Sequence, residues 1–240
     1  MSKIIHMWLE APLQSWGANS RFNVRETLDF PTKSGVLGMV LAALGAKGAQ
    51  EEWLAQMAPL DMQVIAFGAK RGKQLPELPP LLDDYHVVGA GFDDSDPWES
   101  LMMCQTEDGK TTMSSTKLTN RFYLQDLAFS VFLEVPDELS AQIAIALMAP
   151  VWPLCLGRKS CAPTEVIFQG VFDAMEAAQE SAYAFAEQKN RGEVFQVVQG
   201  VVEAEKQVLE VLNICDLPLA FGERKRYSTR LVTMIFPAAL

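Results

Sequence analysis

Residues 30–45, FPTKSGVLGMVLAALG, decide how the chain begins to fold. Pro31 ends the preceding segment, Thr32 or Ser34 can cap a helix, and the apolar run that follows continues the helix. The first N–H groups of a helix have no partner inside it, and with the helix dipole they favour an anion. Lys33 adds a positive charge beside them. The stretch predicts either an ordinary capped core helix or a helix start that binds phosphate.

The chain has 240 residues, of which 49% are hydrophobic, so it can bury a sizeable core. No apolar run reaches the roughly 18 residues that a membrane-spanning helix needs. The first residues, MSKIIHMWL, read as a strand and not as a signal peptide. Cys104, Cys155, Cys161 and Cys215 show neither a CxxC pair nor histidines at zinc spacing. These features predict a cytoplasmic protein with reduced thiols, no membrane contact, no metal and no cofactor.

The net charge of −10 is unusual for a nucleic-acid binder, but the charge is unevenly distributed. Residues 1–50 carry five basic and three acidic groups, and residues 219–240 carry four and one. The segments 51–100 and 169–218 are strongly acidic. Because salt screens surface charges over roughly 8–10 Å, an acidic protein can still present a basic groove. Such a protein would bind nucleic acid weakly alone, which favours a role as one part of an assembly.

The apolar segments predict an α+β protein. The expected helices and strands, in chain order, are a strand at 3–10, helices at 33–46 and 50–58, a strand at 62–69, a strand through 121–134, a helix at 137–148 and a strand-like piece at 151–156. Residues 12–31 read as a loop, and residues 70–120 as a long insertion of the kind that is usually functional or disordered.

This order is the split βαβ pattern of a ferredoxin-like, RNA-recognition-type core. We expect that core to occupy residues 1–160. Residues 161–240 contain short β-rich runs around an acidic, alanine-rich piece at 173–190, which favours a small C-terminal β-rich region.

Residues 156–161, LGRKSC, place a glycine before two basic residues and a serine hydroxyl group. Glycine allows a ligand to approach the backbone closely, and Arg158 and Lys159 suit phosphate oxygens. An ordinary basic turn on the surface is an equally good interpretation of this segment.

Residues 117–123 follow the insertion and offer a second basic and aromatic combination. Arg121 and Tyr123 are two apart and share a strand face, where a phosphate could meet one and a base could stack on the other. A solvated sheet face fits the same spacing. His86, one of only two histidines, is more typical of a packed or stacking residue than of a general base. The sequence shows no Ser-His-Asp pattern, no phosphate-binding loop and no well-placed pair of carboxylates, so no motif indicates catalysis.

The motifs together resemble a known family. They are APLQSWG at 11–17, FPTKSGVLG at 30–38, DYHVV at 84–88, NRFYLQD at 120–126, LGRKSCAP at 156–163 and the basic tail at 224–230. This set is similar to the CasD subunits of type I-E CRISPR Cascade complexes, within the repeat-associated mysterious protein superfamily. Either FPTKSGVLG or LGRKSC alone would be a weak signal, but their combination is specific.

The resemblance implies a non-catalytic subunit that holds the 5′ handle of the CRISPR RNA. It also implies a β-hairpin thumb, here at about residues 83–122, and contacts with the terminal backbone subunit and the large subunit. Contact with target DNA near the PAM-proximal end is left open. The RNA-binding residues expected on this basis are Trp16, Arg21, Arg25, Thr32, Lys33, Ser34, His86, Lys117, Arg121, Tyr123, Arg158, Lys159 and Ser160. Because residues 169–218 are acidic, no individual roles are carried over to the C-terminal region.

Two other function classes compete with this interpretation. Type I-C relatives process the CRISPR RNA precursor, and Tyr85, His86 and Lys117 could then serve as acid, base and charge stabiliser. The type I-E-like LGRKSC motif argues against that alternative. A purely structural domain, in which the basic clusters contact protein carboxylates, is the third class.

Overall fold

The computed structural model describes residues 2–17, 23–72, 76–88, 108, 117–202 and 208–237, with the backbone alone at 88, 117, 208 and 209. Its centre is a seven-stranded sheet in which every neighbouring pair is antiparallel. The strands, in spatial order, are β10 (Phe168–Phe172), β1 (Ser2–Glu10), β9 (Ala128–Pro136), β6 (Met62–Ala69), β11 (Arg191–Gln199), β13 (Arg226–Phe236) and β12 (Val208–Ala220).

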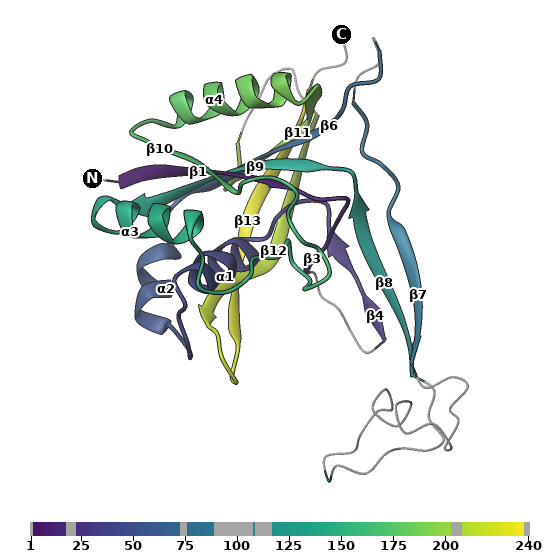
Figure 1. Cartoon of the computed structure of the whole chain (residues 1–240), viewed down its shortest axis with the longest axis horizontal. Coiled ribbons are helices and arrows are strands. Elements are labelled where there is room, and N and C mark those ends of the chain that lie inside the picture. The colour runs from purple at the N-terminus through teal and green to yellow at the C-terminus, as the bar shows by residue number, and fades with distance from the viewer. Residues whose placement is uncertain are drawn as a thin grey trace.

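Helices cover both faces of this sheet (Figure 1). One face packs against α1 (Lys33–Ala43), α2 (Glu51–Met57) and α3 (Asp137–Met148) through the larger apolar cluster. The other face packs against α4 (Met175–Gln188). A strand that is buried on both faces is apolar along its length and does not alternate with polar residues. This explains why β1 is apolar from Ile4 to Leu9, apart from the buried His6.

Short strands build an arm beside the body. In the arm, β8 (Lys117–Gln125) pairs with β7 (Leu82–Val88), with β4 (Val24–Arg25) and with β2 (Leu13–Gln14). Separately, β3 (Trp16–Gly17) pairs with β5 (Thr27–Leu28). Figure 1 shows β7 and β8 as a ribbon that stands away from the seven-stranded sheet.

The mixed helix and strand class, with a core dominated by its sheet, agrees with the sequence prediction. The helices at 33–46, 50–58 and 137–148 and the strand at 62–69 form within three residues of their expected bounds. The expected loop at 12–31 contains four two-residue strands, β2 to β5. The expected strand through 121–134 is two strands, because the chain turns at Asp126, whose φ is +46°.

One expected element in the second half of the chain was wrong, and another segment has a structure that the sequence analysis did not assign. Residues 151–156 form no strand: Pro150 and Pro153 lack N–H donors, and the strand that completes this side of the sheet is β10. Residues 173–190 hold a helix, α4, whose alanines recur every fourth residue and are buried against the sheet. The strands β11, β13 and β12 extend the main sheet from β6.

Within the described residues, no helix is long and apolar enough to cross a membrane. In the same part of the chain, no group of three His, Cys, Asp or Glu side chains is placed to hold a metal ion. Cys155, Cys161 and Cys215 are free thiols.

Candidate nucleic-acid interface

A groove of about 490 Å³ runs along α1, from Ser34 to Ala42. Three other parts of the chain complete it: β3 to β5, the loop at 153–158, and the hairpin that joins β12 to β13. The residues that line it are Ser15, Trp16, Gly17, Arg25, Glu26, Thr32, Ser34, Gly35, Gly38, Met39, Ala42, Pro153, Leu154, Cys155, Gly157, Arg158, Lys225 and Tyr227. Segments from both ends of the chain therefore meet at one site.

Three basic side chains, Arg25, Arg158 and Lys225, reach the groove from three different elements. The Arg158 guanidinium lies 4.5 Å from the centroid of the Tyr123 ring, and its Nη2 donates to the Arg25 backbone oxygen at 2.8 Å. These contacts fix the direction of the guanidinium, because a cation over an aromatic face is attracted by the ring quadrupole. One carboxylate, Glu26, lies among them.

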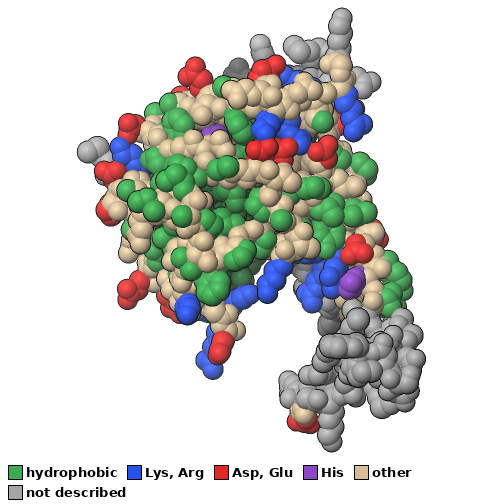
Figure 2. All heavy atoms as spheres, in the orientation of Figure 1, with side chains coloured by type: hydrophobic (Ala, Val, Ile, Leu, Met, Phe, Trp, Pro, Cys, Tyr) green, Lys and Arg blue, Asp and Glu red, His purple; other side chains and the backbone are tan. Residues whose placement is uncertain are grey.

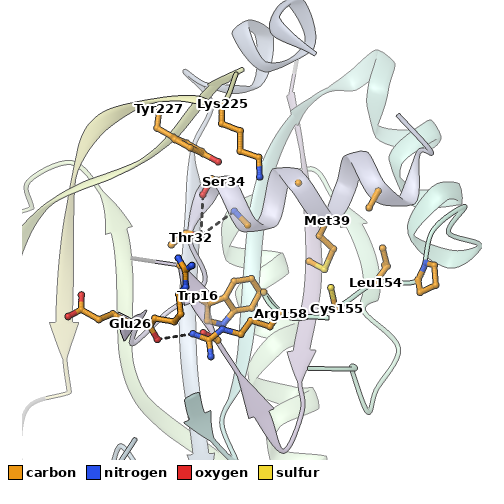
Figure 3. A pocket seen from close by; sticks show the side chains of 18 residues that line it. Trp16, Glu26, Thr32, Ser34, Met39, Leu154, Cys155, Arg158, Lys225 and Tyr227 are labelled. Carbon is orange, nitrogen blue, oxygen red and sulfur yellow. Dashed lines mark hydrogen bonds between the residues drawn. The ribbon is translucent and has the colours of Figure 1, made fainter. Parts of the chain in front are cut away.

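The groove combines these charges with aromatic and apolar walls. Figure 3 shows Lys225 and Tyr227 on one side of Thr32 and Ser34, and Trp16 and Arg158 on the other side. In the space-filling view, Lys and Arg side chains gather in the recess between the body and the arm (Figure 2). Positive charge beside aromatic surface is what single-stranded nucleic acid requires.

Trp16 forms a buried wall of the groove and packs on the start of α1. A Cβ at Gly35 would lie 2.9 Å from Thr32 Oγ1 and 3.0 Å from Trp16 Cε3, so the tryptophan needs a glycine there. The ring is 1% exposed, and its Nε1 donates to Gln14 Oε1 at 3.2 Å. Trp16 therefore shapes the groove through packing.

Lys33 does not lie in the groove, which corrects the prediction that it meets phosphate. The residue is fully buried, and its Nζ donates to the backbone oxygens of Ala58, at 2.8 Å, and of Leu60. Gln199 Oε1 is a third partner at 3.3 Å. Burial, with repulsion from Arg230, lowers the pKa of Lys33 to about 8.

The start of α1 is also occupied by the protein's own groups. The Lys33 N–H donates to Asp216 Oδ2 at 2.7 Å, and the Gly35 N–H donates to Thr32 Oγ1 at 3.1 Å. Asp216 is itself held by Arg230, with N–O distances of 2.7 and 2.9 Å. The anion that a helix N-terminus favours is therefore an internal carboxylate. Thr32 is the cap, and Ser34 lies at the wall of the groove, where its hydroxyl group donates to Thr32 Oγ1 at 3.3 Å.

Gly157 is needed for a close approach, but the group that approaches it is Ser15. With φ at +91°, a Cβ at Gly157 would lie 1.6 Å from the Ser15 backbone oxygen. The loop is closed by hydrogen bonds between Leu156 and Cys161 and between Cys161 and Arg158. Lys159 and Ser160 lie at its exposed tip and do not line the groove.

Tyr123 is 6% exposed and lies under the Arg158 guanidinium. The expectation that a base stacks on this ring was wrong, because the protein already covers it. Arg121 is partly exposed. It lies opposite Arg25 of β4 and opposite Asp84 of β7 in the strand register of the arm.

His86 is partly exposed and lies two residues from Asp84, so it shares the face of the arm that carries Arg121. Lys117 is the first residue of β8. Arg21 lies outside the described residues, as does the expected thumb from 89 to 116 apart from residue 108.

Sequence reasoning did not assign Lys225 or Tyr227 to the site, although both line the groove. The basic cluster at 224–226 was the available signal. Asp216, whose position determines that Lys33 is internal, had no local signal because it lies 183 residues from Lys33.

The chain is similar to known proteins in sequence and in fold. The model of the family described as CRISPR-associated protein (Cas_Cas5) matches residues 4–233. The CRISPR system Cascade subunit CasD of Escherichia coli (strain K12) is 26% identical over 179 residues, which are 73% of this chain and 74% of that protein.

Two solved structures share the fold. A chain of a CRISPR RNA-guided surveillance complex superposes with a TM-score of 0.66 at 26% identity, covering 98% of this chain and 90% of that one. A crystal structure of a Cas protein gives a TM-score of 0.57 at 26% identity, covering 98% and 95%. The chain belongs to this family of CRISPR-associated proteins, which confirms the resemblance indicated by its motifs.

Proposed function

We propose that this chain is an RNA-binding subunit of a type I-E-like Cascade surveillance complex in antiviral defence, and that it binds the 5′ handle of the CRISPR RNA in the groove beside α1. Its similarity to CasD of Escherichia coli and to a chain of an RNA-guided surveillance complex supports the kind of assembly. The groove supports the proposed role of the chain in that assembly, which is RNA binding.

The observation that carries the proposal is the convergence of Arg25, Arg158 and Lys225 on a groove walled by Tyr227 and Trp16. The three basic side chains contact phosphate groups of the RNA, while the Tyr227 ring is the aromatic surface on which a nucleobase stacks. Ser34 adds a hydroxyl group. Arg121 and His86 on the arm, with Lys159 and Ser160 at the loop tip, extend the proposed contacts beyond the groove.

We infer that the first part of the chain is a ferredoxin-like core and that the arm is the base of a thumb. The spatial order β10-β1-β9-β6 corresponds to fourth, first, third and second in a β-α-β-β-α-β unit, which supports the first inference. The position of β7 and β8, between β6 and β9 in sequence, supports the second. We keep residues 1–160 and 161–240 as the two proposed parts, with β10 of the second completing the sheet of the first.

We propose that the subunit has no catalytic role. Tyr85 and His86 are neighbours in β7, so their side chains leave opposite faces of the ribbon. An acid and a base on opposite faces cannot act on one phosphodiester bond. This geometry disfavours the endoribonuclease alternative.

The proposed partners are the CRISPR RNA, the terminal backbone subunit and the large subunit, with target DNA near the PAM-proximal end as a further contact. Binding of RNA to a chain with a net charge of −10 is favoured only where the basic residues gather. The remaining acidic surface helps to orient the RNA toward the groove.

The test is binding of RNA oligonucleotides with and without the 5′ handle to complex that contains this chain. We expect the handle to raise affinity, and replacement of both Arg25 and Lys225 by alanine to lower it about tenfold or more, since two phosphate contacts are lost. Arg226→Ala is the matched control: Arg226 pairs with Glu51 at 3.0 Å and does not line the groove. Equal effects of the control and the double variant would contradict the proposed site.

A further inference from the structure

A patch of exposed apolar side chains lies at the end of α3 and in the loop that follows. Ile145, Met148, Val151 and Trp152 are 64, 59, 62 and 50% exposed. All four fall within eight residues of sequence, and Figure 2 shows hydrophobic side chains gathered on this face, over α3 and the following loop. Concentrated exposed apolar surface on a folded protein marks an interaction site.

The helix is apolar on two faces. Ile143 and Leu147 are buried against the sheet, while Ile145 and Met148 point outward. A surface helix normally carries polar residues on its outer face. The outward residues of α3 therefore have no role in the core of this chain.

The loop after α3 is fixed in place by α1. The Val151 N–H donates to the Ala43 oxygen at 3.0 Å, and the Trp152 N–H donates to the Ala42 oxygen at 3.3 Å. The Val151 side chain fits against Gly45, where an added Cβ would approach it to 2.9 Å. Because the patch is already ordered, this chain loses little conformational entropy when a partner covers it.

We propose that this patch, Ile145, Met148, Val151 and Trp152, docks a second and different protein subunit. That subunit would present an apolar surface that is complementary to these four side chains. The proposal rests on the proposed membership of a multi-subunit complex, but not on RNA binding by the groove. Trp152, large and central in a rigid site, is the expected anchor.

Charge decides between a protein and the other possible occupants. Residues 137–157 contain no Lys or Arg, and their only charged residues are Asp137 and Glu138. RNA binding depends on cations that neutralise phosphates, so this surface does not suit RNA. A second copy of the chain would bring another net charge of −10 to the contact, which opposes self-association.

The patch borders the groove, since Pro153 and Leu154 follow Trp152 directly and line it. A subunit docked on the patch would therefore stand next to RNA held in the groove. In this arrangement the loop at 151–158 connects the protein contact with the RNA contact.

The first experiment is hydroxyl-radical footprinting of the assembled complex, read by mass spectrometry at each tryptophan. We expect oxidation of Trp152 to fall to the low level of Trp8 and Trp16, which are 0 and 1% exposed. RNA alone, added to the free chain, should leave Trp152 reactive. Protection by RNA alone would make the patch an RNA contact, and protection that depends on the concentration of the free chain would make it a self-contact. Either result, or an unprotected Trp152 in the complex, overturns the proposal.

The second experiment measures incorporation of variants into the complex. Trp152→Ala and Ile145→Glu should each reduce it about tenfold, while the melting temperature of the free chain stays unchanged because both side chains are exposed. Val201→Glu is the matched control, since Val201 is 63% exposed and lies at the end of β11. Normal incorporation of both patch variants would contradict the docking surface. Loss of RNA binding with intact incorporation would instead concern the groove.

Discussion

Two groups of basic side chains flank the start of α1, and they differ in what surrounds them. Lys33 and Arg230 are enclosed in the protein, where the Lys33 Nζ donates to backbone oxygens and Asp216 accepts from the Lys33 N–H and from Arg230 Nε and Nη2. Arg25, Arg158 and Lys225 line an open groove.

The difference shows that a basic residue beside a helix N-terminus is not by itself an anion site. Inside the protein, Asp216 from a strand distant in sequence pairs with Arg230 and accepts the first helical N–H, while Asp216, Asp61 and Glu134 all attract the Lys33 charge. In the groove, three cations face one carboxylate, so the balance is left positive. The enclosed group stabilises the fold, and the open group is the one proposed to bind RNA.

Removal of the internal carboxylate should have the largest effect on stability. Asp216→Ala leaves the enclosed Arg230 without its ion-pair partner, and we expect a loss of about 3–5 kcal/mol in the free energy of unfolding. Urea denaturation measures it. Glu51→Ala, which breaks an ion pair with side chains 59 and 57% exposed, should cost less than about 1 kcal/mol. Similar losses in both variants would mean that the Asp216 cluster is not enclosed.

Gly157→Ala tests how the wall of the groove is built. The new Cβ would collide with the Ser15 oxygen at 1.6 Å in a backbone with φ at +91°, so we expect a loss of about 3 kcal/mol. Since Gly157 and Ser15 both line the groove, RNA affinity should fall as well. Gly48→Ala also changes a glycine of positive φ, but nothing lies within 4 Å, and it should cost about 1 kcal/mol. A tolerated Gly157→Ala would show that the loop does not need this close approach.

The enclosed lysine should also reveal itself in the pH dependence of stability. Its pKa is lowered to about 8 by burial, against 10.5 in an unperturbed lysine. Between these values the unfolded chain binds more protons, so the free energy of unfolding should rise as pH increases through this window. We expect the free energy of unfolding of the original chain to rise by on the order of 1–3 kcal/mol relative to that of Lys33→Gln. Urea denaturation of both proteins at each pH measures this difference. A difference that stays constant from pH 8 to 10.5 would show that Lys33 keeps its ordinary pKa.

How far the sequence predicted the molecule depends on the range of the interactions. The helix at residue 33 and its Thr32 cap involve neighbours in sequence, and both were predictable. The location of Lys33 depends on Asp216, which is 183 residues away in sequence, and no local pattern shows it. The close approach at Gly157 was predicted from its residue type, but the identity of the approaching group depends on how two distant loops meet.

The same reasoning explains what was missed in the second half of the chain. The segment of α4 reads only as an acidic, alanine-rich piece until the sheet face that its alanines cover is known. Lys225 and Tyr227 belong to a hairpin whose strands pair with each other over ten positions, but only the packing of β12 on α1 brings that hairpin to the groove. Tertiary packing, and not local propensity, selects which basic residues face solvent at the site.

The most direct test of the contrast between the enclosed and the open basic group is the salt dependence of RNA binding. The logarithm of the affinity for RNA with the 5′ handle is measured against the logarithm of the salt concentration for the original chain, Lys225→Ala and Lys33→Gln, each in the complex. Each lost phosphate contact with single-stranded RNA lowers the slope by about 0.7. We expect Lys225→Ala to lose about this amount of slope and Lys33→Gln to keep the original slope. A lower slope in Lys33→Gln with no change in Lys225→Ala would contradict it.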